Sequence, residues 1–280
     1  MDDLFINKAI NYFLIEDIGN RDITTEAIFS EESHGRAVFI AKGSFIVAGI
    51  REVAVRVFKS LNPEVECQVF ANDGEMVNNE DMLLEVSGPV IDLLKGERVA
   101  LNLIQRLCGI ATLTASFVDA VKSYRATIVD TRKTTPGLRI LEKYAVRVGG
   151  GRNHRFNLAD GVLIKDNHIA ACGSIRTAVE LVRDQVPHMM KIEVEAESLE
   201  QVRECLECQV DVIMLDNMSV AMMRKAVKLV NGKAVIEASG GVSLKNVKKI
   251  AATGVDLISV GRLTHSAPAC DISMRLSLLS

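Results

Sequence analysis

The chain has 280 residues, of which 48% are hydrophobic and 25% are charged, as in a globular protein of one large or two smaller domains rather than a disordered one. Its formal net charge of −3 argues against a general nucleic-acid-binding surface, and we expect no nucleic-acid partner. No apolar run approaches the roughly 20 residues of a membrane helix, and the acidic start Met1-Asp2-Asp3 is unlike a signal peptide. We therefore expect a cytoplasmic protein without membrane association.

The first hundred residues predict an α+β domain over residues 1–108. Alternating apolar and polar residues between Gly and Asn turns indicate strands, one apolar segment indicates a helix, and a longer apolar segment predicts one or two helices that lead into the rest of the chain. The predicted strands are 35–50, 64–77 and 82–86, and the predicted helical segments are 50–61 and 93–122.

The second part of the chain alternates short β-rich runs with amphipathic stretches. The runs are 126–130, 161–164, 191–194, 212–215, 234–236 and 255–260, and the last four begin about 21 residues apart. Ser198, Ser219 and Ser243 stand where helix N-caps belong. This spacing predicts parallel β/α units and a closed or nearly closed barrel over residues 109–269, and we expect the tail 270–280 to pack on the first domain.

Polar or glycine-rich residues follow all six predicted strands, at the end of a β/α barrel where binding groups gather. Residues 130–170 contain eight Lys or Arg and four acids, a local excess of +4 that indicates an anionic ligand. Glycine turns such as Ser239-Gly240-Gly241 and Gly261 suit a phosphate. Glu195 and Asp216 suit either Mg²⁺ or sugar hydroxyls, and Glu193 suits the same role or an ion pair with a nearby Lys.

Other motifs allow more than one interpretation. His154 and His168 are candidate acid–base groups or hydrogen-bond donors, and the three glycines 149–151 indicate either a mobile loop or a plain linker. Cys205 and Cys208 form a C-x-x-C inside a helical pattern, and no second pair stands at zinc spacing. We interpret them as reduced thiols.

Several motifs resemble quinolinate phosphoribosyltransferases. The run Asp-Thr-Arg-Lys-Thr-Thr-Pro-Gly at 130–137 is similar to the signature of that family. Further matches follow in the family's order at 16–19, 22–25, 97–102, 153–155, 165–168, 215–217, 237–241 and 260–266. The resemblance extends from residue 16 to about residue 271. One departure is Cys108, where the family pattern has Ser, and it affects no catalytic position.

The resemblance implies an N-terminal open sandwich followed by an incomplete, roughly seven-stranded α/β barrel of the type II phosphoribosyltransferase kind, in a homodimer. It implies transfer of a phosphoribosyl group from phosphoribosyl pyrophosphate to quinolinate, which yields nicotinate mononucleotide, pyrophosphate and CO₂ in NAD biosynthesis. Mg²⁺ would be required and no organic cofactor is expected.

The resemblance also implies roles for individual residues. Catalytic roles fall to Lys133, Lys165, Glu195 and Asp216, of which the two acids would bind ribose hydroxyls or Mg²⁺. Arg98 would enter the site from the partner subunit. The remaining substrate-binding positions are Thr131, Arg132, His154 and Arg155 for the anionic groups, and Ser239, Gly240, Gly241, Val260 and Gly261 for the ribose 5-phosphate.

Three alternatives remain at this point. Lys165 at a barrel strand end is also compatible with a Schiff-base lyase, although the density of Arg favours anion binding. A repurposed paralogue, such as the pyrophosphorylase-like protein of molybdate-transport operons, is less compatible with the basic residues that this chain retains. The third is nicotinate phosphoribosyltransferase, whose substrate has one carboxylate fewer.

Overall fold

The computed structural model describes residues 3–279, which form two compact units. Of the described residues, the first unit comprises 3–113, Ile140–Gly149 and 267–279, and the second comprises Thr114–Arg139 and Gly150–Ser266. The segment Ile140–Gly149 packs in the first unit, although it lies within the sequence range 109–269 that was predicted for the second domain.

The first unit contains a four-stranded sheet in the order β12-β1-β5-β3. Strand β1 pairs antiparallel with both β5 and β12, and its buried and exposed residues alternate at first, as expected of a sheet with one covered face. Phe39 of β1 meets Phe58 of α3 edge to face, with 5.8 Å between the ring centroids. The strands are β1 (His34–Ala41), β3 (Glu66–Val69), β5 (Met82–Pro89) and β12 (Ile272–Leu278), with β2 (Phe45–Ile46) and β4 (Met76–Val77) in a separate small sheet.

The helices of the first unit are α1 (Asp3–Ile18), α2 (Ile23–Ile28), a π-helical turn (Ile50–Ala54), α3 (Val55–Leu61), most of α4 (Val90–Val121) and most of α5 (Arg139–Val148). Gly96 allows α4 to approach α3 closely, because a Cβ at that position would lie 2.6 Å from the ring of Phe58. Contrary to the expectation from the sequence, helix α4 is long and apolar enough to cross a membrane, with a mean hydropathy of 1.3 over 18 residues. Since 56% of that window is buried in the fold, core packing explains the apolar composition.

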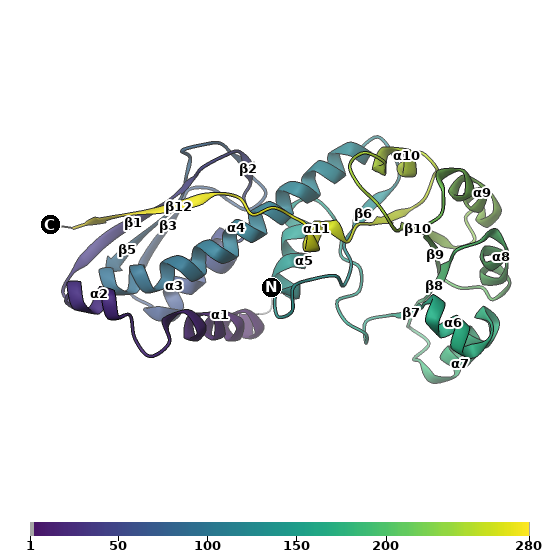
Figure 1. The fold of residues 1–280 in the computed structure, drawn as a ribbon, viewed down its shortest axis with the longest axis horizontal. Coiled ribbons are helices and arrows are strands. Elements are labelled where there is room, and N and C mark those ends of the chain that lie inside the picture. Colours follow the sequence, from purple (N-terminus) through teal and green to yellow (C-terminus); the bar gives the residue numbers. More distant parts are fainter. Residues whose placement is uncertain (1–2, 280) are drawn as a thin grey trace. The chain divides into compact units, whose positions relative to one another are not determined.

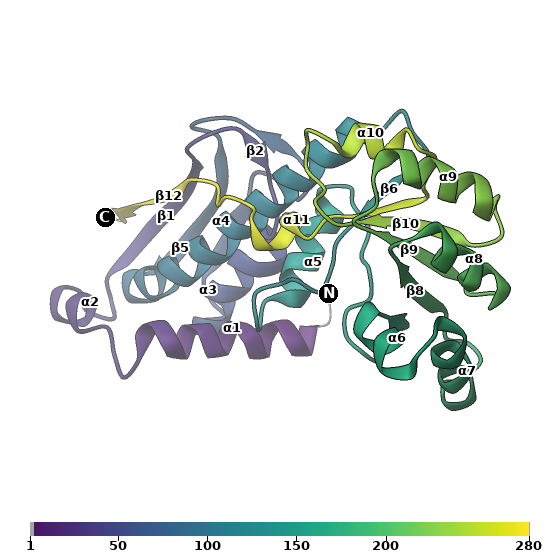
Figure 2. The same ribbon diagram turned by 45° about the vertical axis from the view of Figure 1, so that its right-hand side comes forward.

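The second unit is a parallel sheet in the order β6-β11-β10-β9-β8-β7 with helices between successive strands (Figures 1 and 2). An isolated parallel bridge between Val129 and Arg152 adds a rudimentary seventh position beside β6. The strands are β6 (Thr127–Val129), β7 (Val162–Ile164), β8 (Ile192–Ala196), β9 (Val212–Asp216), β10 (Val235–Ser239) and β11 (Leu257–Ser259). The helices are α6 (Asp166–Cys172), α7 (Ile175–Gln185), α8 (Leu199–Glu207), α9 (Val220–Val230), α10 (Val247–Ala251) and α11 (Arg262–His265).

The structure confirms the six strands predicted for the second part of the chain, with ends shifted by a few residues. It also confirms the predicted N-caps Ser198 and Ser219, whose side chains accept N–H groups of the first helical turn. The N-cap predicted at Ser243 is wrong: α10 begins after Asn246, and the Asn246 side chain instead accepts the N–H of Ser243 at 2.8 Å. The single strand predicted for 35–50 is divided: β1 ends at Ala41, the chain bends at residues 42–44, and β2 covers only Phe45–Ile46 before the π-helical turn begins after the left-handed Gly49 (φ 90°).

Candidate active site

A cavity of about 620 Å³ lies at the carboxyl ends of the parallel strands in the second unit. Side chains two residues apart on a strand point to the same face, so Glu193 and Glu195 of β8 are directed alike, as are Glu237 and Ser239 of β10. The predicted site residues that line the cavity are Thr131, Arg132, Lys133, His154, Arg155, Lys165, Glu195, Asp216, Ser239, Gly240 and Gly241. Strands that are far apart in sequence thus bring most of the predicted site together.

The cations of the cavity differ in how firmly they are held. Lys165 donates to Oε1 of Glu195 at 2.7 Å, and Arg155 donates from Nη1 to the carbonyl of Gly161 at 2.7 Å. Burial, followed by the nearby Arg132, lowers the pKa of the Arg155 guanidinium from its usual range. Nε of Arg132 is buried without a hydrogen-bond partner among the described residues. Close, partly desolvated guanidinium groups of this kind are stabilised by an anionic ligand.

Asp130 is fully buried and belongs to the support of the cavity rather than to its surface. Its two oxygens accept hydrogen bonds from Nδ2 of Asn153 at 2.6 Å and from the backbone N–H of His154 at 2.9 Å. These bonds attach the segment that contains His154 and Arg155 to the end of β6. The acid at the start of the Asp-Thr-Arg-Lys run therefore positions residues that follow 24 positions later.

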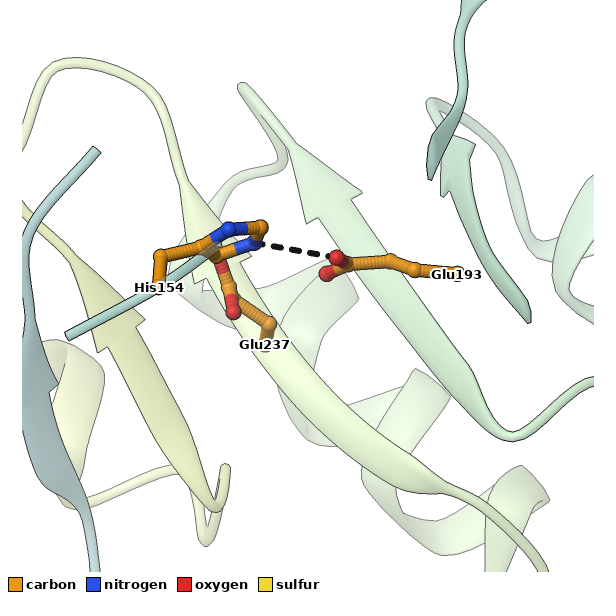
Figure 3. Close-up of side chains that lie close together, drawn as sticks. All are labelled: His154, Glu193 and Glu237. Atoms are coloured by element: carbon orange, nitrogen blue, oxygen red, sulfur yellow. Dashed lines mark hydrogen bonds and ion pairs between the residues drawn. The ribbon is translucent and has the colours of Figure 1, made fainter. Parts of the chain in front are cut away.

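Figure 3 shows the imidazole of His154 beside the carboxylates of Glu193 and Glu237, and of these three residues His154 and Glu237 line the cavity. Nε2 of His154 lies 3.0 Å from Oε2 of Glu193 and 3.8 Å from Oε1 of Glu237. Glu193 thus pairs with a histidine and not with the lysine that the sequence analysis left as an alternative. Burial and the Glu193 carboxylate raise the pKa of Glu237 to about 7.

Glu195 and Asp216 supply the acidic wall of the cavity. One oxygen of Glu195 is paired with Lys165, and Oδ2 of Asp216 accepts a hydrogen bond from Nδ2 of Asn217 at 2.8 Å. Asn217 has a left-handed backbone (φ 52°) and donates its N–H to the carbonyl of Ser239 at 3.0 Å. Carboxylate oxygens are the ligands that Mg²⁺ prefers, and Mg²⁺ in proteins is commonly held by one or two of them together with substrate phosphates.

The glycine turn after β10 leaves room for a ligand at the backbone. Gly240 and Gly241 have φ values of 91° and 60°, and a smaller cavity of about 250 Å³ adjoins them. This second cavity shares Thr131, Lys133, Ser259 and the Ser239–Gly241 turn with the first, and it is completed by Val242, Ser243, Gly261, Arg262 and His265. Exposed N–H groups beside Lys and Arg side chains form a typical phosphate site.

Three predicted residues lie outside the large cavity. Gly261 lines the smaller one, whereas Val260 is 1% exposed and donates its N–H to the carbonyl of Val129, so that this donor is already used. Arg98 belongs to α4 in the first unit, with a side chain that is 56% exposed and 3.9 Å from Glu97. It is not among the residues that line either cavity.

The other candidates from the sequence have structural partners. Nδ1 of His168 accepts the backbone N–H of Lys165 at 3.0 Å, which caps α6. Cys205 and Cys208 are buried free thiols, and burial raises the pKa of both, which makes them poor metal ligands. No metal-binding cluster found within residues 3–279 includes them.

Sequence reasoning missed several residues of the site. Glu237 and Asn217 were recognised only as polar residues at strand ends, and Arg262 and His265 only as members of the motif at 260–266, although all four line a cavity. The period of two along β10 was the available signal for Glu237, because Ser239 at the same strand end was already a candidate.

Comparison with known proteins agrees with this geometry. The chain matches the N-terminal domain of quinolinate phosphoribosyl transferase over residues 22–108 and its C-terminal domain over residues 110–275. It is 48% identical over 278 residues to a "Probable nicotinate-nucleotide pyrophosphorylase (carboxylating)" of Bacillus subtilis, covering 99% of this chain and 96% of that protein. A protein of the same name from Synechocystis is 45% identical, covering 98% of this chain and 93% of that protein.

Solved structures give the same result. The crystal structure of NadC from Streptococcus pyogenes superposes with a TM-score of 0.95 at 42% sequence identity, covering 100% of this chain and 99% of that one. Both domains, the order of the motifs and the fold thus agree over nearly the whole length, and the chain belongs to the quinolinate phosphoribosyltransferase family.

Proposed function

We propose that this protein transfers the phosphoribosyl group of phosphoribosyl pyrophosphate to quinolinate, with loss of CO₂, to form nicotinate mononucleotide for NAD biosynthesis. The observation that carries the proposal is the cavity that combines four cationic side chains, four carboxylates and a glycine turn. Quinolinate has two carboxylates, and phosphoribosyl pyrophosphate has a pyrophosphate, a 5-phosphate and ribose hydroxyls. Each of these groups has a partner of suitable charge in the cavity.

The reaction exchanges one bond at C1 of the ribose for another. The bond from C1 to the pyrophosphate oxygen breaks, C1 takes on oxocarbenium character, and the ring nitrogen of quinolinate forms the new bond. Arg132, Lys133, Arg155 and Lys165 offset the negative charge of the leaving group and of the substrate carboxylates. Holding the two substrates in one cavity supplies a further part of the rate through alignment.

Decarboxylation follows from the product of that step. The pyridinium nitrogen stabilises the electron pair that remains on C2 when the adjacent carboxylate leaves as CO₂, and a proton from solvent then completes the ring. This step needs no organic cofactor. The chain's own contribution is to hold the ring and its second carboxylate against the Arg132 and Arg155 side of the cavity.

The two acids fit a Mg²⁺ requirement. Glu195 and Asp216 offer oxygen ligands in the cavity, and one oxygen of Glu195 remains beside the one that Lys165 occupies. We propose that they hold Mg²⁺ together with substrate oxygens or bind the ribose hydroxyls directly. When bound, the metal would neutralise charge on the pyrophosphate. The 5-phosphate is assigned to the Ser239–Gly241 turn and Gly261, next to Lys133.

A homodimer, with Arg98 contributed to the partner's cavity, is part of the proposal. The exposed side chain of Arg98 supports it, as does the match of the segment 97–102 to the family pattern. We also propose that the enzyme acts in the cytoplasm. The Schiff-base alternative has less support, because Nζ of Lys165 is held by Oε1 of Glu195 at 2.7 Å, whereas a Schiff base requires an amine that is free to attack a carbonyl group.

The direct test uses the purified protein with phosphoribosyl pyrophosphate, Mg²⁺ and quinolinate labelled in the carboxyl group next to the ring nitrogen. We expect equal amounts of labelled CO₂, pyrophosphate and nicotinate mononucleotide, and no product when Mg²⁺ is chelated. Lys133→Ala is the matched control for contaminating activity. Product without release of label, or turnover of nicotinate alone, would contradict the assignment of the substrate.

A further inference from the structure

Arg139, the first residue of α5, is not among the residues that line either cavity, yet its guanidinium group contacts both segments that carry the cavity's arginines. Nε donates to Oγ1 of Thr134 at 2.9 Å, Nη1 to the carbonyl of Phe156 at 3.0 Å, and Nη2 to the carbonyl of Arg132 at 3.4 Å. Arg132 is itself one of the cavity's arginines, and Phe156 directly follows the other, Arg155. We call these three contacts the Arg139 clamp, because one side chain joins two segments.

The two cavity arginines repel each other, so their segments must be held in place when no anion lies between them. Burial and, next, the charge of Arg132 lower the pKa of the Arg155 guanidinium, and the second of these causes is a repulsion between cations. Asp130 connects the two segments ahead of the arginines, through the hydrogen bonds described above. Arg139 connects them a second time, so that each segment is held at two points close to its arginine.

The clamp requires an arginine. A guanidinium group has five N–H donors in a planar fork, whereas the ammonium of lysine is a single point that cannot reach three separate acceptors. All three acceptors of Arg139 are neutral, and no carboxylate within residues 3–279 pairs with it. The clamp therefore holds the segments without placing a negative charge beside the anionic substrates.

Helix stability does not explain a cation at this position. The N-terminal end of a helix carries partial positive charge, which disfavours an arginine as the first residue of α5. The turn before the helix instead directs the side chain to its partners. Gly137 has a left-handed backbone (φ 81°), and the N–H of Leu138 is donated to the carbonyl of Thr135 at 3.0 Å. Through this turn Arg139 returns to Thr134, only five residues back in the chain.

We propose that Arg139 is a positioning residue for the dicarboxylate substrate, and that it fixes the spacing of the Arg132 and Arg155 guanidinium groups before quinolinate binds. This inference rests on the proposed function, in which these two arginines hold the quinolinate carboxylates. A preformed spacing favours binding, because less ordering of the two segments remains to be done when the substrate arrives. Loss of the clamp weakens quinolinate binding and leaves the 5-phosphate site at the Ser239–Gly241 turn intact.

The first test compares the two substrates in steady-state kinetics. We expect Arg139→Gln and Arg139→Lys to raise the KM for quinolinate by about tenfold to a hundredfold, since small misplacements of binding groups have effects of this size. The KM for phosphoribosyl pyrophosphate should change less than twofold. Arg139→Lys keeps the charge and loses the fork, so it separates the clamp from a simple effect of charge.

Arg183 provides the matched control, because it makes the same kind of contact elsewhere in the second unit. Its Nη2 donates to the carbonyls of Cys208 and Gln209 at 2.7 Å and 2.9 Å, and it is not among the residues that line either cavity. Arg183→Lys should leave both KM values as in the wild type. A wild-type KM for quinolinate in Arg139→Lys, or an equal rise of both KM values, would overturn the proposal.

The second test needs no substrate and therefore separates this inference from the proposed function. Amide hydrogen exchange of the free protein, read by mass spectrometry, reports on the N–H groups of Thr134 and Phe156, which are hydrogen-bonded within the two segments. We expect faster exchange over residues 130–137 and 153–161 in Arg139→Lys, and wild-type exchange there in the control variant. Unchanged exchange in Arg139→Lys would overturn the clamp. Faster exchange in a protein whose wild type does not turn over quinolinate would support the clamp and count against the proposed function alone.

Discussion

Replacing Gly240 by alanine probes the link between the glycine turn and the acidic wall of the cavity. A Cβ at this position would lie 2.1 Å from Oδ1 and 2.9 Å from the backbone N of Asn217. The side-chain oxygen could move away, but the backbone nitrogen is held by its hydrogen bond to the carbonyl of Ser239. Gly241 is the matched control, because its φ is also positive and its Cβ would meet no atom within 4 Å.

The two substitutions share a backbone penalty and differ in steric overlap. A non-glycine residue in a left-handed conformation costs about 1–2 kcal/mol, and this cost applies to both. Overpacking adds about 1–3 kcal/mol for Gly240→Ala only. We therefore expect Gly240→Ala to lower the free energy of unfolding by about 2–5 kcal/mol, and Gly241→Ala by about 1–2 kcal/mol.

The effect on activity passes through Asn217. Displacement of this residue also moves Asp216, whose carboxylate accepts the Asn217 amide. Since a misplacement of about 1 Å at a reacting centre can cost about a hundredfold, kcat/KM for phosphoribosyl pyrophosphate should fall by about that factor in Gly240→Ala. Urea unfolding and steady-state kinetics measure the two effects. If Gly240→Ala and Gly241→Ala behave alike in both assays, contact with Asn217 is not the reason for glycine at 240.

Three further predictions concern charge and assembly. In the folded state the pKa of Glu237 is raised from 4.5 to about 7, so its stabilising contribution is complete below about pH 4.5 and is lost as the pH rises through about 7. The free energy of unfolding should therefore fall by about 3 kcal/mol over this range. Urea unfolding at fixed protein concentration should show this fall in the wild type and a smaller one in Glu237→Gln. Arg132→Gln or Arg155→Gln should reduce the preference for quinolinate over nicotinate by about tenfold or more, since loss of a charged donor costs about 1–3 kcal/mol. The preference is measured as the ratio of the kcat/KM values for the two acids. An unchanged ratio would mean that other groups recognise the second carboxylate. Mixing inactive Arg98→Ala with inactive Lys133→Ala under subunit exchange should restore activity, and continued inactivity after verified exchange would show that Arg98 acts within its own chain.

Much of the second unit could be predicted because its signals are local. Each strand is a short β-rich run, and Ser198 and Ser219 cap the following helices through their own side chains. Ser243 failed as an N-cap because the residue pattern does not reveal that Asn246 takes part in the turn. The predicted strand 35–50 failed because the chain bends after Ala41, where the N–H of Lys42 is donated to the carbonyl of Asp271, far along the sequence.

The sequence predicts which residues stand at the strand ends of the candidate site, but not which of their side chains contact one another. The presence of Lys165 and Glu195 at neighbouring strand ends followed from the order of the chain, whereas their contact at 2.7 Å depends on side-chain conformation. The group of His154, Glu193 and Glu237 was not predicted, because it joins a loop to two strands that another strand separates in the sheet. Such a group depends on the register of the strands and on the path of the loop that contains His154.

The pairing of β1 with β12 has a consequence for how the protein is made. Strand β1 lies between β12 and β5, so one of its edges is completed only by residues that follow the entire second unit in the chain. During synthesis β5 becomes available early, but the edge of β1 from Gly35 to Ala41 stays open until Ile272–Leu278 has emerged. An open edge invites pairing with other chains, so the nascent protein passes through an aggregation-prone interval whose length is set by the time needed to translate the barrel.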